Sequence, residues 1–396
     1  MPSISQKARH MPSSPIRKLV PYAEAAKKKG VHVHHLNIGQ PDIKTPKNAL
    51  IAVQQATIDV LSYSRTEGSD AFREKIAKYY QRLNLTVSAS DIVVTTGGSE
   101  ALSFALGALL DPDDELIIPE PFYANYSGFA EAHNVKIVPV TCTFETQFAL
   151  PSVEAFEKRI TNRTKAILIC NPSNPTGYVY RKDELEQLAE IALKHDLFLI
   201  SDEVYREFVY DGAQHFSMLS FEALNEHVVV IDSVSKRYSM CGARIGFAVT
   251  KNNALRGAIL KFAQARLSPP TYAQIASEAA LDTDESYFAE VLKEYNARRN
   301  FLVEALKQIP GVETAVPTGA FYCMVKLPVK SAEDFAQWLL EHFSLNNETV
   351  MVAPAAGFYT TKGLGEDEVR IAYVLEIDAL KRAVHILEKG LEAYLA

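Results

Sequence analysis

Short apolar runs recur along residues 91–250, and stretches with helical spacing separate them. Several runs, such as Val228-Val229-Val230-Ile231, are apolar throughout instead of alternating with polar residues. Strands covered on both faces have this composition, and strands that alternate with helices are typical of a mainly parallel sheet. The pattern predicts an α/β fold with seven strands, at residues 91–95, 115–119, 135–140, 165–170, 197–202, 228–232 and 244–250.

The last predicted strand follows its predecessor after a short link, residues 233–243. A parallel crossover usually needs a helix and about a dozen or more residues. Residues 244–250 are therefore expected to run antiparallel in an otherwise parallel sheet.

The second half of the chain has a different pattern. A long helical stretch runs from Thr271 to Gln308, and Pro310-Gly311 ends it. Shorter elements follow, with strands expected at 321–327, 350–354 and 369–374, and helices at 332–342 and from residue 377. This arrangement predicts a smaller α+β domain beside the large one.

Composition excludes several classes of protein. The 396 residues are 47% hydrophobic and 22% charged, which is typical of a globular chain with more than one domain. A net charge of −7 argues against a nucleic-acid partner, and Lys27-Lys28-Lys29 is expected to end a solvated helix. No stretch reaches the roughly 20 apolar residues that span a bilayer, and Met1 to Lys18 lacks a signal-peptide core, so no membrane partner is expected.

Neither the cysteines nor the histidines indicate a metal site. The cysteines form no Cys-x-x-Cys pair, so we expect no disulfide framework and a reducing, cytoplasmic location; they are Cys142, Cys170, Cys241 and Cys323. His32, His34 and His35 cluster without a clear carboxylate or cysteine partner, so a structural or surface role is predicted and no metal.

The strongest chemical signal is Lys236, in the run Ser233-Val234-Ser235-Lys236-Arg237 directly after an apolar strand. A lysine condenses with an aldehyde only as the free amine, and neighbouring cations such as Arg237 and Arg244 would lower its pKa. Ser233, Ser235 and Arg244 together suit a phosphate dianion. An aldehyde that carries a phosphate is pyridoxal phosphate; the alternative is a solvated loop without chemistry.

Ser233-x-x-Lys236, followed eight residues on by Arg244-Ile245-Gly246, resembles the cofactor-lysine signature of class I aminotransferases. These are pyridoxal phosphate enzymes of fold type I. The resemblance implies that Lys236 is the catalytic residue, carrying the cofactor as a Schiff base and moving a proton from the substrate α-carbon. It also implies that the N-terminal segment joins the small domain, which gives a small domain of residues 1–45 and 286–396 and a large cofactor-binding domain of residues 46–285.

Asp202 stands at the carboxyl end of the predicted strand 197–202, where ligands bind in open α/β sheets. A carboxylate there could keep the cofactor's pyridine nitrogen protonated, although it could also simply cap a helix. Asp202-Glu203-Val204-Tyr205 and the loop from Asn171 to Gly177 also resemble the family's motifs. The resemblance implies that Tyr205 and Asn174 bind the phenolic oxygen of the cofactor ring.

Gly97-Gly98-Ser99-Glu100 lies between a predicted strand and a predicted helix. Glycines allow close approach of the backbone to a phosphate, and the free N–H groups of a helix start bind anions. Gly98, Ser99 and Glu100 are therefore expected on the phosphate side of the cofactor.

Two tyrosines resemble family positions, although each could equally be a packed tyrosine. Tyr123 corresponds to the aromatic residue that stacks on the cofactor beside the substrate. Tyr63 corresponds to a residue that reaches the phosphate of a neighbouring subunit, which would make the active unit a homodimer.

Arg370, in Val369-Arg370-Ile371, resembles the arginine that binds the substrate α-carboxylate, and a planar guanidinium suits that group. The alternative is an exposed arginine on a strand. Gly39 resembles the glycine whose backbone meets the same carboxylate, so the expected substrate-binding set is Gly39, Tyr123, Asn174 and Arg370.

The resemblance implies an aminotransferase that passes an amino group from an L-amino acid to 2-oxoglutarate. Aspartate is the first expectation, but its side chain needs a second cation, and residues 100–110 contain no Lys or Arg. Arg17, Lys18 or Arg237 could supply that cation; otherwise the substrate would be aromatic or alanine. A carbon-sulfur lyase of the same fold is a rival, whereas a non-catalytic regulator is disfavoured because only about 30 residues precede the small-domain strand.

Overall fold

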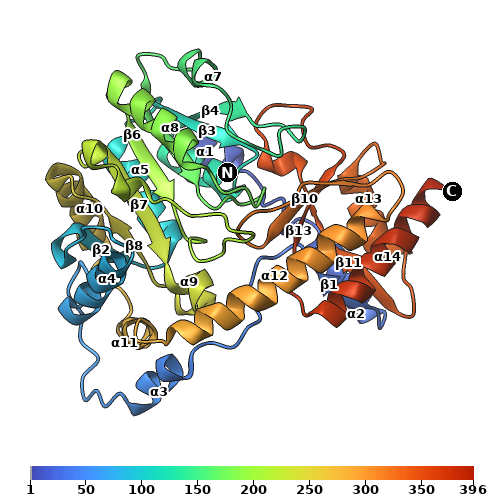
Figure 1. The fold of residues 1–396 in the computed structure, drawn as a ribbon, viewed down its shortest axis with the longest axis horizontal. Helices are drawn as coiled ribbons and strands as arrows, with labels where there is room; N and C mark the ends of the chain where they lie inside the picture. Colours follow the sequence, from blue (N-terminus) through green and yellow to red (C-terminus); the bar gives the residue numbers. More distant parts are fainter. Residues whose placement is uncertain (1) are drawn as a thin grey trace.

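The computed structural model describes residues 2–396, and its centre is a seven-stranded sheet (Figure 1). The strand order is β2-β8-β7-β6-β5-β3-β4, and only β8 runs antiparallel to its neighbours. The prediction of a mainly parallel sheet with one antiparallel strand is therefore confirmed. Its strands are β2 (Ile92–Thr95), β3 (Glu115–Glu120), β4 (Lys136–Thr141), β5 (Thr164–Cys170), β6 (Phe198–Asp202), β7 (Val228–Ser233) and β8 (Gly246–Val249).

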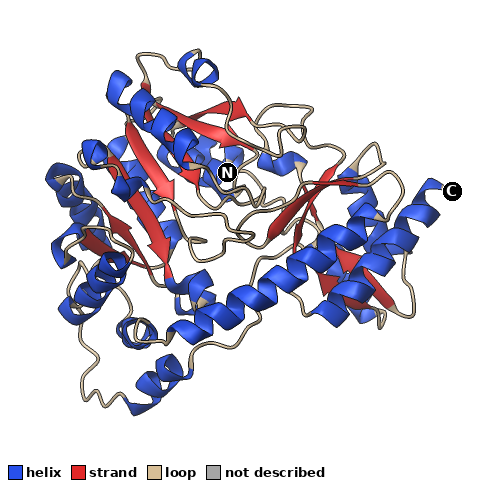
Figure 2. Ribbon diagram, viewed as in Figure 1, coloured by secondary structure: helices blue, strands red, loops and turns tan. Residues whose placement is uncertain are grey.

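Helices cover both faces of this sheet, which explains its uninterrupted apolar runs (Figure 2). Along β7, Val229 and Ile231 belong to one core cluster, while Val228 and Val230 belong to another. Successive side chains of a strand point to opposite faces, so a strand buried on both faces does not alternate between apolar and polar residues. One face packs against α5 (Gly98–Leu109), α6 (Asn125–His133) and α10 (Asn253–Arg266), and the other against α4 (Asp70–Arg82), α8 (Lys182–His195) and α11 (Thr271–Ala280).

Two smaller sheets lie beside the large one (Figure 1). In one, β1 (His32–His35) pairs in parallel with β11 (Glu348–Met351), so the N-terminal segment joins the C-terminal part of the chain. The other has the antiparallel order β12 (Ala353–Pro354), β13 (Glu368–Ala372), β10 (Tyr322–Lys326), β9 (Glu313–Thr314). Around them lie α2 (Val20–Lys28), α12 (Glu285–Lys307), α13 (Ala332–His342) and α14 (Ile377–Leu395). The domain limits at residues 45 and 286 remain a prediction.

Two predicted elements are divided in the structure. The helical stretch from Thr271 is two helices, α11 and α12, because the chain turns at residues 281–284 and the Asp284 carboxylate accepts a bond from Ser286 N, capping α12 (2.8 Å). The strand expected at 350–354 is split into β11 and β12, which pair with different sheets. Pro354 has no N–H to donate, and it lies on an edge strand, where proline is tolerated.

The remaining helices are short, and one of them carries the predicted catalytic lysine. They are α1 (Gln6–His10), α3 (Lys47–Gln55), α7 (Val153–Glu157) and α9 (Val234–Arg237). Within residues 2–396, no helix is both long and apolar enough to cross a membrane.

The histidine cluster has one partner that lies far away in the sequence. His34 is buried and its Nε2 lies 3.0 Å from Glu348 Oε2, across the pairing of β1 with β11. No group of three or more His, Cys, Asp or Glu side chains able to hold a metal ion is found in the described part of the chain.

Candidate active site

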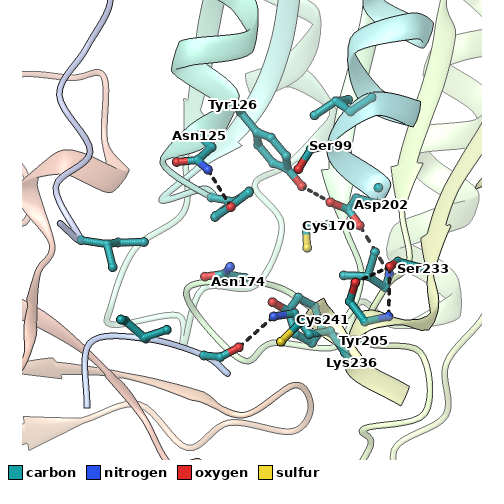
Figure 3. A pocket seen from close by; sticks show the side chains of 18 of the residues that line it. Ser99, Asn125, Tyr126, Cys170, Asn174, Asp202, Tyr205, Ser233, Lys236 and Cys241 are labelled. Carbon is teal, nitrogen blue, oxygen red and sulfur yellow. Dashed lines mark hydrogen bonds between the residues drawn. The ribbon is translucent and has the colours of Figure 1, made fainter. Parts of the chain in front are cut away.

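A cavity of about 490 Å³ opens at the carboxyl ends of β5, β6 and β7. The N-terminus of α5 forms one wall, and β10, β13 and residues 14–17 and 38–40 form another (Figure 3). Most of the residues singled out in the sequence line it: Gly39, Gly98, Ser99, Tyr123, Asn174, Asp202, Tyr205, Ser233, Ser235, Lys236, Arg244 and Arg370.

Lys236 lies inside this cavity because α9 begins where β7 ends. Its Nζ donates to the carbonyl oxygen of Gly39 (2.8 Å) and lies 5.9 Å from the centre of the Tyr205 ring. Burial lowers the pKa of the lysine to about 8, and the cations Arg370 and Arg244 act in the same direction. A substantial free-amine fraction near neutral pH makes it a competent nucleophile.

The residues predicted to bind the cofactor phosphate form a cradle at the start of α9, the helix that carries Lys236. Ser233 Oγ lies 2.7 Å from Ser235 Oγ and accepts from Ser235 N, so both hydroxyls are held at the start of α9. Gly97 has φ of 80°, and a Cβ there would lie 2.3 Å from Arg244 Nη2. Only glycine allows the start of α5 to approach this guanidinium so closely, and the resulting set of hydroxyls, guanidinium and helix N–H groups suits a dianion.

Asp202 forms the far end of the cavity, and its carboxylate accepts a hydrogen bond from the Tyr126 hydroxyl (2.7 Å; Figure 3). Burial raises the pKa of Asp202 to about 6. Tyr126 was missed in the sequence; it lies in the first turn of α6, three residues after Tyr123, which precedes that helix. The Tyr123 and Tyr126 rings pack edge to face at 5.4 Å.

Arg370 is 1% exposed and comes from β13 on the opposite side. It donates to Asn174 Oδ1 (2.9 Å) and to the Asn37 carbonyl oxygen (2.5 Å). Within residues 2–396 its Nε has no hydrogen-bond partner. Burial lowers the pKa of Arg370, and a buried guanidinium with an unused N–H is a binding group for a carboxylate.

A comparison with known families settles the class of enzyme. The family model for aminotransferase class I and II matches residues 31–387. The chain belongs to this family. It is 33% identical to the aspartate aminotransferase of Pyrococcus horikoshii over 90% of both chains, and 31% identical to aromatic-amino-acid aminotransferase 2 of Thermococcus litoralis over 98% of both. The solved alanine aminotransferase of Pyrococcus furiosus superposes with a TM-score of 0.90 at 32% identity, covering 99% of this chain and 100% of that one.

Class I and II aminotransferases depend on pyridoxal phosphate, and the residues present fit it. The cradle at Ser233, Ser235 and Arg244 suits the phosphate, and Asp202 suits the pyridine nitrogen. Lys236 lines the same cavity and could condense with the aldehyde of a cofactor held there. The unused N–H of Arg370 adds a place for the substrate carboxylate.

Two residues predicted for this aminotransferase site do not line the cavity. The Glu100 carboxylate turns back to accept from Thr96 N (2.7 Å) and lies 3.4 Å from Arg266, so only its backbone could serve a phosphate. Tyr63 is 79% exposed and lies in a separate surface hollow with Leu61 and Thr96.

Tyr322 is a site residue that the sequence did not reveal. Its hydroxyl lies 2.8 Å from the Tyr205 hydroxyl, and its ring lies under the Arg370 guanidinium at 4.4 Å. A Cβ on Gly39 would come within 1.8 Å of the Tyr322 hydroxyl, so this ring requires glycine at position 39. The only signal for Tyr322 was its place on a predicted strand that would pair with the strand of Arg370.

Of the three cations considered for an acidic side chain, only Arg17 lines the cavity, beside Ser14 and Gln40. Lys18 pairs with Glu333. Arg237, expected to face the cofactor lysine, is instead fully buried and paired with Asp232. The charge beside Lys236 is therefore that of Arg370 and Arg244.

Proposed function

We propose that this aminotransferase binds pyridoxal phosphate covalently through Lys236 and transfers the amino group of aspartate to 2-oxoglutarate. The observation that carries the proposal is that Lys236 lines the same cavity as the phosphate cradle, Asp202 and Arg370. Bound there, the cofactor would supply an electron sink for the charge that develops at the substrate α-carbon.

The side chains of the site divide the remaining work. Arg370 and Asn174 hold the substrate carboxylate and fix the α-carbon next to Lys236. The Lys236 amine, with its lowered pKa, takes the α-proton and returns it as general base and acid. Asp202 would hold a proton on the pyridine nitrogen, and the hydroxyl of Tyr205 could bind the phenolic oxygen of the bound cofactor.

An absorbance experiment tests this function. Protein reconstituted with pyridoxal phosphate should show the band of the covalently bound cofactor, lose it on addition of aspartate, and regain it on addition of 2-oxoglutarate. Release of pyruvate and ammonia from cystathionine would instead indicate the lyase. Failure to bind the cofactor would contradict the proposal.

The choice of aspartate rests on Arg17, which lines the cavity with its neighbours Ser14 and Ile16. We expect Arg17→Gln to lower kcat/KM for aspartate about tenfold, the loss of one charged hydrogen bond, and to leave alanine almost unchanged. The half-reaction with each amino acid should be measured without a keto acid, so that binding of 2-oxoglutarate does not affect the measured rate.

Lys18→Gln is the matched control for this prediction, because Lys18 is the neighbouring cation but pairs with Glu333. It should leave the aspartate half-reaction unchanged. A substrate panel in which tyrosine, phenylalanine or alanine reacts much faster than aspartate would refute the assignment, whatever the effect of Arg17.

We also propose that the active unit is a cytoplasmic homodimer in which Tyr63 reaches the phosphate of the neighbouring subunit. The 79% exposure of Tyr63 and the adjacent exposed Val60 and Leu61 support an interface at this segment. Four free cysteines support a reducing location.

A further inference from the structure

A buried ion pair brackets the helix that carries the catalytic lysine. Asp232 precedes Ser233, and Arg237 follows Lys236, so the two residues stand on either side of the segment 233–236. Arg237 Nη2 donates to both carboxylate oxygens of Asp232 at 2.9 Å, and both side chains are fully buried. Asp232 Oδ1 also accepts from Ser233 N at 2.7 Å.

Both members of this pair are fixed to other elements. Asp232 Oδ2 accepts from the Tyr80 hydroxyl of α4 (3.0 Å) and from Arg206 Nη1 (3.2 Å). Arg237 Nε lies 2.8 Å from Glu207, and its guanidinium lies over the Tyr79 ring at 4.4 Å. Although burial alone would raise it, Arg237 and Arg206 hold the pKa of Asp232 below its ordinary value. The carboxylate therefore stays charged and ties α9 to α4 and to the segment after β6.

The short helix α9 cannot hold its own geometry. It has four residues, whereas isolated helices shorter than about 12 residues are marginal in water. Buried ion pairs are also a weak source of stability, because apolar residues of similar volume often do as well. The pair is thus better explained by the direction it gives to α9 than by the stability it gives to the fold.

We propose that Asp232 and Arg237 are positioning residues that hold α9 so that Lys236 reaches the reacting carbon and both serine hydroxyls face the phosphate. The role of Lys236 in this inference rests on the proposed function. The ion pair itself does not, because neither Asp232 nor Arg237 lines the cavity.

Arg237→Lys tests the bracket, because it keeps the charge but replaces a guanidinium that contacts Asp232 through Nη2 and Glu207 through Nε with a single nitrogen. We expect kcat to fall about ten- to a hundredfold, as for a small misplacement of a reacting group, with KM for aspartate changed less than threefold. In the apoprotein, Lys236 should gain contact with water, and its pKa, measured by the pH dependence of chemical labelling, should rise from about 8 toward 10.5.

Arg206→Lys is the matched control, because Arg206 shares Asp232 and the same burial but stands outside α9. It should lower the melting temperature, leave kcat within about twofold of wild type and leave the labelling pKa of Lys236 unchanged. Equal effects of the two variants on kcat and on the labelling pKa, or no effect of Arg237→Lys on either, would overturn the proposal.

If Arg237→Lys does not fold, Glu207→Gln provides a milder test, since it removes the charge that Arg237 Nε contacts at 2.8 Å and leaves Asp232 and its partners unchanged. It should shift the labelling pKa of Lys236 in the same direction by a smaller amount, and an unchanged pKa would overturn the proposal. If wild-type protein takes up no pyridoxal phosphate, the proposed function fails. The labelling experiment on the apoprotein would still show whether Asp232 and Arg237 position Lys236.

Discussion

Lys236→Ala is expected to abolish transamination, lowering kcat by about 10⁴-fold or more. General acid–base catalysis alone contributes about 10²–10⁴, and this variant also loses the covalent attachment of the cofactor. The cavity itself should remain, because Lys236 makes one hydrogen bond, to the Gly39 carbonyl, and projects into the cavity. Single-turnover kinetics with aspartate should show the loss, while Lys182→Ala, at an exposed lysine paired with Glu186, should react like wild type.

The same variant should change the pH dependence of stability in the apoprotein. The folded-state pKa of Lys236 is about 8 and the ordinary value is 10.5, so between these values the native state binds fewer protons than the unfolded state. Wild-type stability therefore gains as pH rises through this window, by roughly up to 3 kcal/mol, and the penalty is fully present below pH 8. Lys236→Ala has no such amine, so its stability should not rise with pH for this reason. Denaturant unfolding at pH 7 and pH 10 should reveal the difference, and a variant with wild-type turnover would refute the role of the lysine.

The large sheet could be predicted from the sequence because its strands are buried on both faces. Apolar runs such as Val228 to Ile231 indicate that burial directly. The short link after β7 indicates that the next strand runs antiparallel. The site followed, because Asp202 and Ser233 end adjacent parallel strands and must meet at one edge.

What the sequence could not show depends on contacts between distant segments. Tyr322 enters the site only because β10 pairs with β13, and Tyr126 meets Asp202 only through the packing of α6. Arg237 was expected among the cations that act on Lys236, and the structure pairs it elsewhere for a related reason. Arg237 follows Lys236 in the sequence, but its partner is Asp232. Both cations lie in the four-residue helix α9, which directs their side chains to different sides.

The substrate depends on a part of the site that is built differently from the rest. Asp202 and Ser233 stand at strand ends and are buried, whereas Arg17 is exposed on the segment before α2. Relatives at similar identity are named for aspartate and for aromatic amino acids, so overall likeness does not decide the side chain. Arg17 and its neighbours on residues 14–17 are therefore where specificity should be sought.

Asp202→Asn is expected to lower kcat about 10²–10³-fold, the effect of losing one preorganised charge at a catalytic centre. An amide cannot keep a proton on the pyridine nitrogen, so the charge developing at the α-carbon would be poorly stabilised. The fold should tolerate the change, since the amide oxygen can still accept the Tyr126 hydroxyl. Asp196→Asn is a matched control, because Asp196 is 96% exposed and remote from the cavity, and its activity should equal that of wild type.

The loss of activity in Asp202→Asn should be accompanied by a gain in stability of the apoprotein. Burial raises the pKa of Asp202 from 3.8 to about 6, so between these values the native state holds a proton that the unfolded state has released. Wild-type stability consequently falls as pH rises through this window, by roughly 2–3 kcal/mol, and the loss is complete above pH 6. The variant carries no such charge, so it should unfold at higher denaturant than wild type at pH 7 but not at pH 4. Equal stability at pH 7 would mean that the carboxylate is not strained by burial. A carboxylate that destabilises the protein without cofactor is then explained by its partner, because the pyridinium of the bound cofactor would supply the positive charge that the empty site lacks.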